Sequence, residues 1–228
     1  MNQFVLAFPM KCAVEEPIVL NENVSITCDA KNFIIPGCGV SVEIVRKPSM
    51  DGVAEIFKEH QDVLPESLAE IKNHQSLLFL VGEVKTIEQV SQVNKAIVKL
   101  LEVGALGVYM QQSGAAWCAA NFNEELGDGE YPLDTWLNFV EDNEWIYTLG
   151  MACFALPDLC IAKSSENAQE ALLLAADALF GDGVPAKSGS EVDVGETYTL
   201  RQLAKNPFSK NDPEYNKQGI FCLMKSSR

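Results

Sequence analysis

The sequence predicts an α+β protein in which helices pack on a mixed β-sheet. Short apolar runs separated by turn residues, which are typical of strands, recur from the start of the chain, at residues 4–10, 25–29 and 40–46. Apolar residues with helical spacing occur at about 90–101 and 167–180. Apolar residues make up 47% of the 228 positions, which is enough to bury a sizeable core.

The first helical region is expected after Ser49, where the strand patterns at the start of the chain end. Within the strand at 40–46, alternation places Val40, Val42 and Ile44 on one face. Pro65 then divides the helical region into two pieces. It suits the first turn of the second piece, because an N–H there would have no helical partner.

Residues 76–113 show the clearest unit. The apolar run 77–81 predicts a buried strand, and Thr86 with Gln89 predicts a capping box at the start of the next helix. Gly104 suits the end of that helix, and residues 106–110 predict a second strand. The connection has the length of a right-handed parallel crossover, so the sequence predicts a βαβ unit.

The second half repeats this outline. Strands are predicted at 145–149, 159–161, 196–200 and 219–224, with a buried helix at 167–180 that has Asn167 as its N-cap. We therefore predict one domain, residues 1–228, made of two similar βαβ-like (ferredoxin-like) halves. The halves would cover about 1–126 and 127–228.

The charge of the chain restricts its partners. A formal net charge of −15 repels nucleic-acid phosphate and anionic membranes, and it favours a basic protein partner. Residues 103–123 carry no charge, but Gln111, Gln112 and Asn121 make them unsuited to hydrocarbon. We expect a buried strand followed by a helix there. Residues 1–9 predict a first strand, and they lack the basic start of a signal peptide.

The cysteines indicate a reducing compartment. Seven cysteines, an odd number without a C-x-x-C pair, accompany two histidines, so neither a disulfide framework nor a zinc cage is expected. No glycine-rich phosphate loop opens a helix. We expect buried free thiols, a cytoplasmic location, and no metal or other cofactor. Cys118 with His74 as its base is the best candidate for a catalytic pair. The alternative is a structural thiol and an unrelated histidine.

Two surfaces are candidates for binding. Gln111, Gln112 and Ser113 end a strand that should be central, with Trp117 nearby, and this position suits either a ligand pocket or the capping of a following helix. The second candidate is a segment without Lys or Arg, where acids alternate with aromatics. Its partner-binding candidates are Glu124, Glu125, Asp128, Glu130, Trp136, Glu141 and Asp142. The alternative for this segment is an amphipathic helix that buries Leu133, Trp136, Leu137 and Val140.

Residues 82–110 and the motifs 144–151 and 156–159 resemble a bacterial family, domain of unknown function 4261, over about residues 70–200. The resemblance implies a bacterial cytoplasmic protein and assigns no functional residue.

The function predicted from these observations is that of a non-enzymatic cytoplasmic binding protein. An acidic–aromatic docking face would serve an immunity-like or other protein-interaction role. One alternative is an enzyme or small-molecule binder with a pocket at the end of the 105–113 strand. Another is a structural module that forms homodimers.

Overall fold

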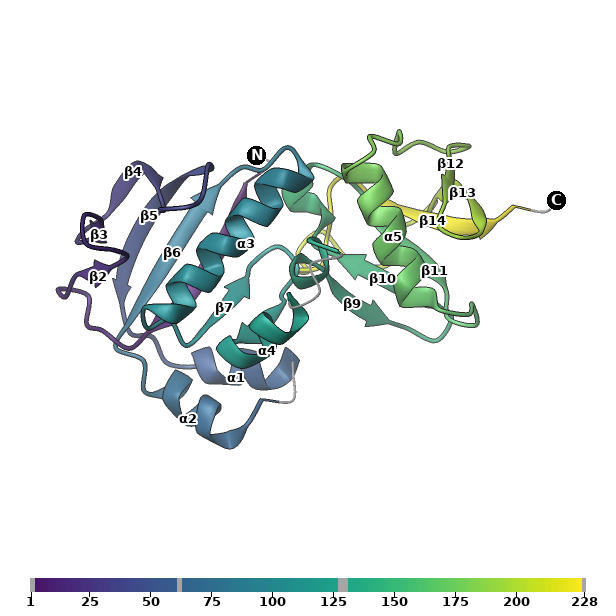
Figure 1. Cartoon of the computed structure of the whole chain (residues 1–228). Helices are drawn as coiled ribbons and strands as arrows, with labels where there is room; N and C mark the ends of the chain where they lie inside the picture. Colours follow the sequence, from purple (N-terminus) through teal and green to yellow (C-terminus); the bar gives the residue numbers. More distant parts are fainter. Residues whose placement is uncertain (1–2, 61–62, 127–130, 227–228) are drawn as a thin grey trace.

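Two six-stranded sheets, which lie side by side, form the framework of the chain (Figure 1). The computed structural model describes residues 3–60, 63–126 and 131–226. The first sheet has the order β4-β5-β6-β1-β7-β8, and the second has the order β12-β13-β14-β11-β10-β9. Helices and mixed sheets together confirm the predicted α+β class. None of the helices in the described ranges is long and apolar enough to cross a membrane.

The first half contains most of the helices. Its elements are β1 (Phe4–Met10), the short pair β2 (Ile18–Val19) and β3 (Ser25–Ile26), β4 (Ala30–Ile34), β5 (Ser41–Pro48), α1 (Val53–His60), α2 (Pro65–Lys72), β6 (Ser76–Gly82), α3 (Ile87–Glu102), β7 (Gly107–Met110), β8 (Ala116–Cys118) and α4 (Ala119–Glu125). As predicted, Pro65 occupies the first turn of α2. The helix α3 lies across one face of the first sheet, and α1 packs against the opposite face; α1 and α2 are seen below the sheet in Figure 1.

The predicted unit of strand, helix and strand at 76–113 is present with one addition. Both β6 and β7 pair antiparallel with β1, so they run parallel to each other with β1 between them. The Thr86 side chain accepts a hydrogen bond from the Gln89 N–H at 3.3 Å, as the capping box predicts. Gly104, with φ +112°, follows the end of α3. The split unit places the first strand of the chain at the centre of the sheet.

The second half is mostly strand. It contains the short 3₁₀ helices η1 (Asp134–Trp136) and η2 (Met151–Phe154), the helix α5 (Ala168–Phe180), and the strands β9 (Asn138–Glu141), β10 (Trp145–Leu149), β11 (Asp158–Ala162), β12 (Glu191–Asp193), β13 (Thr197–Gln202) and β14 (Ile220–Lys225). Here β11 and β14 pair in parallel, but the chain passes through α5, β12 and β13 between them. The two halves thus share a six-stranded sheet with a long helix on one face, and they differ in their other helices and in their connections.

Two local predictions are wrong, and a third is right in position only. Residues 133–140 form η1 and then β9, because Val140 and its neighbours pair with β10 and the chain is extended from Leu137 onward. The chain after Gly114 forms the second strand of a β7–β8 hairpin before α4 begins, since Gly114 takes φ +74° in the hairpin turn. Asn167 stands at the N-cap of α5, as predicted, but its backbone is left-handed and its side chain makes no capping hydrogen bond.

One hydrophobic cluster contains residues of both halves, and Trp136 lies within it. Its ring meets Phe4 of the first sheet edge-on, with centroids 5.4 Å apart, and Phe154 of the second half at 5.8 Å. The indole N–H donates to the Asn94 side chain on α3 at 2.6 Å. Gly150 closes the same junction: a Cβ there would lie 2.8 Å from both Ser113 Cβ and Trp136 O.

Candidate functional site

Of the four residues predicted as ligand-binding candidates at the end of the 105–113 strand, three have side chains that hydrogen bond within the fold and one is exposed. Gln112 accepts a hydrogen bond from the Val5 N–H at 3.0 Å and so ties the hairpin turn to β1. Ser113 is buried and accepts from the Ala115 N–H within the turn, so it stabilises a hairpin instead of capping a helix. The Trp117 indole donates to Thr135 O at 2.9 Å. Only Gln111 is exposed, and it lines an apolar pocket beside α1.

The predicted acidic–aromatic face is not assembled as expected. Trp136 is 2% exposed, so its ring cannot anchor a partner at the surface. Asp128 and Glu130 lie outside the described residues, as does the side chain of Glu125. Glu124 is exposed on α4. The physical reason for the correction is that Trp136 fills the junction of the two halves.

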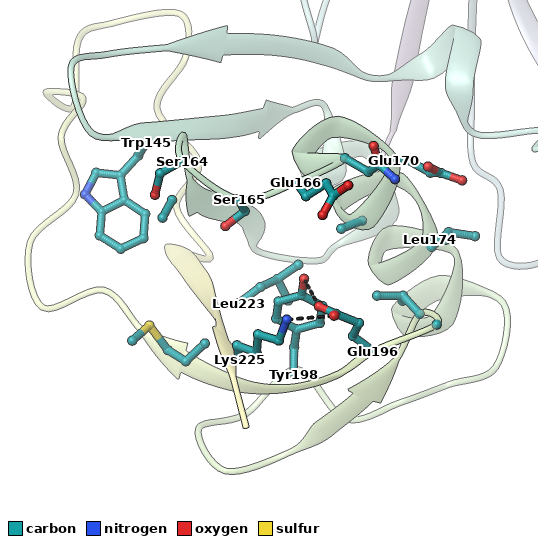
Figure 2. Close-up of a pocket in the computed structure, with 16 residues that line it drawn as sticks. Trp145, Ser164, Ser165, Glu166, Glu170, Leu174, Glu196, Tyr198, Leu223 and Lys225 are labelled. Carbon is teal, nitrogen blue, oxygen red and sulfur yellow. Dashed lines mark hydrogen bonds and ion pairs between the residues drawn. The ribbon is translucent and has the colours of Figure 1, made fainter. Parts of the chain in front are cut away.

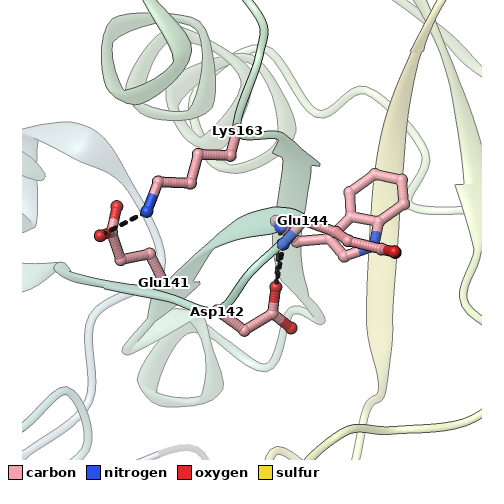
Figure 3. A network of polar contacts seen from close by, with 5 residues as sticks. Glu141, Asp142, Glu144 and Lys163 are labelled. Atoms are coloured by element: carbon pink, nitrogen blue, oxygen red, sulfur yellow. Dashed lines mark hydrogen bonds and ion pairs between the residues drawn. The ribbon is translucent and has the colours of Figure 1, made fainter.

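Glu141 and Asp142 have local partners (Figure 3). Glu141 forms an exposed ion pair with Lys163 at 2.6 Å. Asp142 accepts hydrogen bonds from the Tyr147 hydroxyl at 2.7 Å and from the backbone N–H groups of Glu144 and Trp145, which close the β9–β10 turn. The Tyr147 hydrogen bond, followed by these two, lowers the pKa of Asp142. Asp142 therefore stabilises a hairpin.

Cys118 and His74 do not form a catalytic pair. The Cys118 thiol donates to the Asn121 side chain at 3.1 Å. One ring nitrogen of His74 lies 2.8 Å from Ile71 O, and the other accepts from the Met50 N–H. Both ring nitrogens are therefore engaged by backbone groups. Among the described residues, no group of three or more His, Cys, Asp or Glu side chains is placed to hold a metal ion.

A groove that the sequence did not reveal opens between α5 and the end of the second sheet (Figure 2). We call it the α5 groove. Its volume is about 650 Å³. Its walls come from the turn before α5, the first turns of that helix, the β12–β13 hairpin, the end of β14 and the start of β10. The lining residues are Trp145, Ala162, Ser164, Ser165, Glu166, Asn167, Glu170, Ala171, Leu174, Val194, Gly195, Glu196, Tyr198, Leu223, Met224 and Lys225.

Local backbone geometry shapes both walls of the groove. Asn167, with φ 51°, turns the chain from β11 into α5, and Glu166 and Glu170 are exposed on that wall. Gly195, with φ +88°, makes the β12–β13 turn that presents Glu196. Leu223 is buried beneath them. These parts are far apart in sequence and meet because β14 pairs with both β11 and β13.

The α5 groove contains more carboxylates than cationic side chains. Lys225 forms an ion pair with Glu196 at 2.6 Å, and this contact is the largest cause of the lowered pKa of Glu196 and of the raised pKa of Lys225. The Tyr198 hydroxyl donates to the same carboxylate at 3.3 Å. Glu166 and Glu170 form no ion pair with any described residue. The groove therefore has a negative wall beside an aromatic ring.

Cys160 and Cys222 form a buried thiol pair on the opposite face of the second sheet. They are in register on the parallel strands β11 and β14, and their sulfur atoms lie 2.8 Å apart. The hydrogen bond from Cys160, with a smaller contribution from Arg201, lowers the pKa of Cys222. Two thiols this close can be joined as a disulfide, because adjacent strands place Cα atoms within the range that a disulfide bridges.

We expect hydrogen peroxide to link Cys160 to Cys222. The Cys222 thiolate would attack one peroxide oxygen to give a sulfenic acid and hydroxide, and the Cys160 sulfur would then displace the second hydroxide, with the released protons giving two water molecules. Peptide mapping by mass spectrometry should find the linked peptide in the wild type and not in Cys222→Ser. The exposed Cys28 is the internal control. Over-oxidation of Cys222 without any linked peptide would contradict this expectation.

Comparisons with known proteins add no relative: no protein-family model matches the chain, and neither the curated proteins nor the solved structures gave a match. The resemblance of residues 70–200 to domain of unknown function 4261 stays a prediction.

Proposed function

We propose that the protein is a non-enzymatic binding protein whose α5 groove receives a cationic group of a basic protein partner. The observation that carries the proposal is the pair of exposed carboxylates Glu166 and Glu170, which have no ion-pair partner among the described residues. They occupy the helix side of the groove, with Tyr198 and Lys225 on the other side (Figure 2). A lysine or arginine of a partner would pair with these carboxylates through charge-assisted hydrogen bonds.

The overall charge supports the same type of partner. With a net charge of −15, the protein attracts a basic molecule at long range, and the groove then supplies short-range contacts. Screening by salt weakens both contributions, so the affinity should fall as ionic strength rises. An anionic partner would meet repulsion at both distances.

We propose the bacterial cytoplasm as the setting of this function, with an immunity-like or other protein-interaction role. The seven cysteines are free thiols in the structure, which suits a reducing compartment. The bacterial origin depends on the family resemblance.

The double substitution Glu166→Gln and Glu170→Gln tests the proposal. We expect it to weaken the binding of a lysine- and arginine-rich peptide by about 10-fold, because each exposed ion pair contributes up to about 1 kcal/mol. Isothermal titration calorimetry at low salt, repeated at high salt, measures this effect. Substitution of Lys225 by Met should strengthen binding about 3-fold, since it frees Glu196 for the peptide.

Glu55 and Glu59 provide the matched control. They are exposed and one turn apart on α1, so their change to Gln removes the same charge from another helix. We expect this control variant to bind the peptide less than about 3-fold more weakly than the wild type, because only the long-range electrostatic attraction is reduced. Equal losses in the two double variants, or no binding at low salt, would contradict the α5 groove as the docking site.

A further inference from the structure

A second cavity of about 270 Å³ lies between α1 and the face of the first sheet that is opposite α3. We call it the α1 pocket. Its sheet side includes Val5, Ala7, Leu77 and Phe79, and its helix side includes Ile56 and Phe57. Alternation along the strands explains the apolar lining: Leu6 and Leu78 face the main core, while their neighbours in sequence face this pocket.

The helix side of the α1 pocket is held in place by fixed contacts. The Phe57 ring is fully buried and lies directly on Gly107 of β7, where a Cβ would be 2.6 Å from the ring. The segment before α1 is held by the Met50 N–H, which donates to His74 at 3.2 Å. These contacts are made within the chain, so the helix side of the pocket is fixed by the fold itself, as is usual for small-molecule sites.

The polar groups of the α1 pocket are few and uncharged. Tyr109 and Gln111 line it at the β7 side, and no Asp, Glu, Lys, Arg or His is among its lining residues. Burial raises the pKa of the Tyr109 hydroxyl, so this group stays neutral at physiological pH. Neither side chain hydrogen bonds to another residue within 3–60, 63–126 or 131–226, so both can meet a ligand.

We propose that the α1 pocket binds a small neutral organic molecule with an apolar ring and one hydrogen-bonding group directed at Gln111 and Tyr109. The size of the ligand follows from the volume, which is just below the roughly 300–1,000 Å³ of sites for drug-sized molecules. The neutrality follows from the lining, because a carboxylate or ammonium would lose its hydration there without gaining a counter-charge. This site is independent of the α5 groove, which favours a cation.

Three probes that share one ring separate these properties: benzyl alcohol, benzoate and benzylamine. The readout is the chemical-shift change of the backbone amides of Ile56, Phe79 and Gln111 in two-dimensional NMR, so binding of benzylamine at the α5 groove does not register. We expect saturable binding of benzyl alcohol with a Kd of about 1 mM, and binding at least about 10-fold weaker for both charged analogues. Equal affinities of the three probes at these amides would overturn the proposal.

The substitution Ala7→Leu fills the pocket from the middle of β1, and it should abolish the shifts caused by benzyl alcohol. Ala204→Leu is the matched control, because it adds the same atoms at an exposed position of the second half. Circular dichroism checks that both variants are folded. Unchanged benzyl alcohol binding in folded Ala7→Leu would overturn the proposal.

A second variant tests the polar end without altering the volume much. Gln111→Leu should weaken the binding of benzyl alcohol about 5-fold, which corresponds to the typical net value of one hydrogen bond. The affinity for toluene should stay within about 2-fold of the wild-type value. Gln111 is exposed, so this variant is expected to fold even if Ala7→Leu does not. An equal effect on both ligands would show that Gln111 does not recognise the hydroxyl, which contradicts the proposed polar contact.

Discussion

Truncation of Trp136 to alanine is expected to lower the free energy of unfolding by about 4 kcal/mol. The side chain is 2% exposed and touches aromatic rings of both halves, Phe4 and Phe154. Its removal leaves a large cavity and deprives Asn94 of the indole N–H. Urea unfolding followed by circular dichroism measures the change, since this signal does not depend on the deleted fluorophore.

Trp145→Ala is the matched control for this experiment, because it removes the same side chain from the partly exposed edge of the α5 groove. We expect it to lower the free energy of unfolding by less than half as much. Trp136→Phe should lie between the two, since it keeps a ring but leaves Asn94 without its donor. Equal losses for Trp136→Ala and Trp145→Ala would contradict the role of Trp136 at the junction.

The second large effect is a loss of stability as pH rises, caused by Asp158. This carboxyl is 2% exposed at the start of β11, and its burial raises its pKa to about 7. Hydrogen bonds from Asn216 and from the Met151 N–H act in the opposite direction and do not offset the burial. In the unfolded chain the pKa returns to its ordinary value of 3.8.

The sign follows from this difference in pKa. Below the unfolded value, Asp158 is protonated in both states and its full contribution to stability is present. Between 3.8 and about 7 the folded state holds the proton more tightly, so this contribution falls as pH rises, and it is lost above about 7. The expected loss between pH 5.5 and pH 8 is about 2 kcal/mol. This range stays above the isoelectric point, which is near 4.5.

Asp158→Asn isolates the effect, because asparagine is neutral at every pH in the range. Other carboxyls also titrate: burial of Asp177 raises its pKa to about 6, for example, and its contribution is common to both proteins. The free energy of unfolding of the wild type minus that of the variant should therefore fall by about 2 kcal/mol from pH 5.5 to pH 8. A constant difference would show that Asp158 does not titrate in this range.

Much of the first half could be predicted, because its signals are local. Each signal lies within a short stretch of sequence: the apolar run of β6, the capping box of α3 and Gly104 at the end of that helix. All three are present in the structure. The helix considered as the alternative for residues 133–140 is wrong, because the spacing of Leu133, Trp136 and Val140 suits a helix, whereas pairing with β10 makes residues 138–141 a strand. That pairing depends on residues elsewhere in the chain.

The candidate sites were less predictable for the same reason. The Glu166 and Glu196 walls of the α5 groove are brought together because β14 pairs with both β11 and β13, which no local pattern indicates. For the 111–117 segment, the sequence indicated a region but not which side chain would be free. The turn engages Gln112 and Ser113 and leaves Gln111 at the α1 pocket.

The junction at Gly150 has a consequence for how this architecture can vary through evolution. With φ +117° and no room for a Cβ between Ser113 and the Trp136 carbonyl, position 150 cannot drift to alanine without moving one half against the other. Surface residues of either half can change freely by comparison. A glycine here, together with an aromatic residue fourteen positions earlier, should therefore mark descendants of a common ancestor long after the rest of their sequences have diverged.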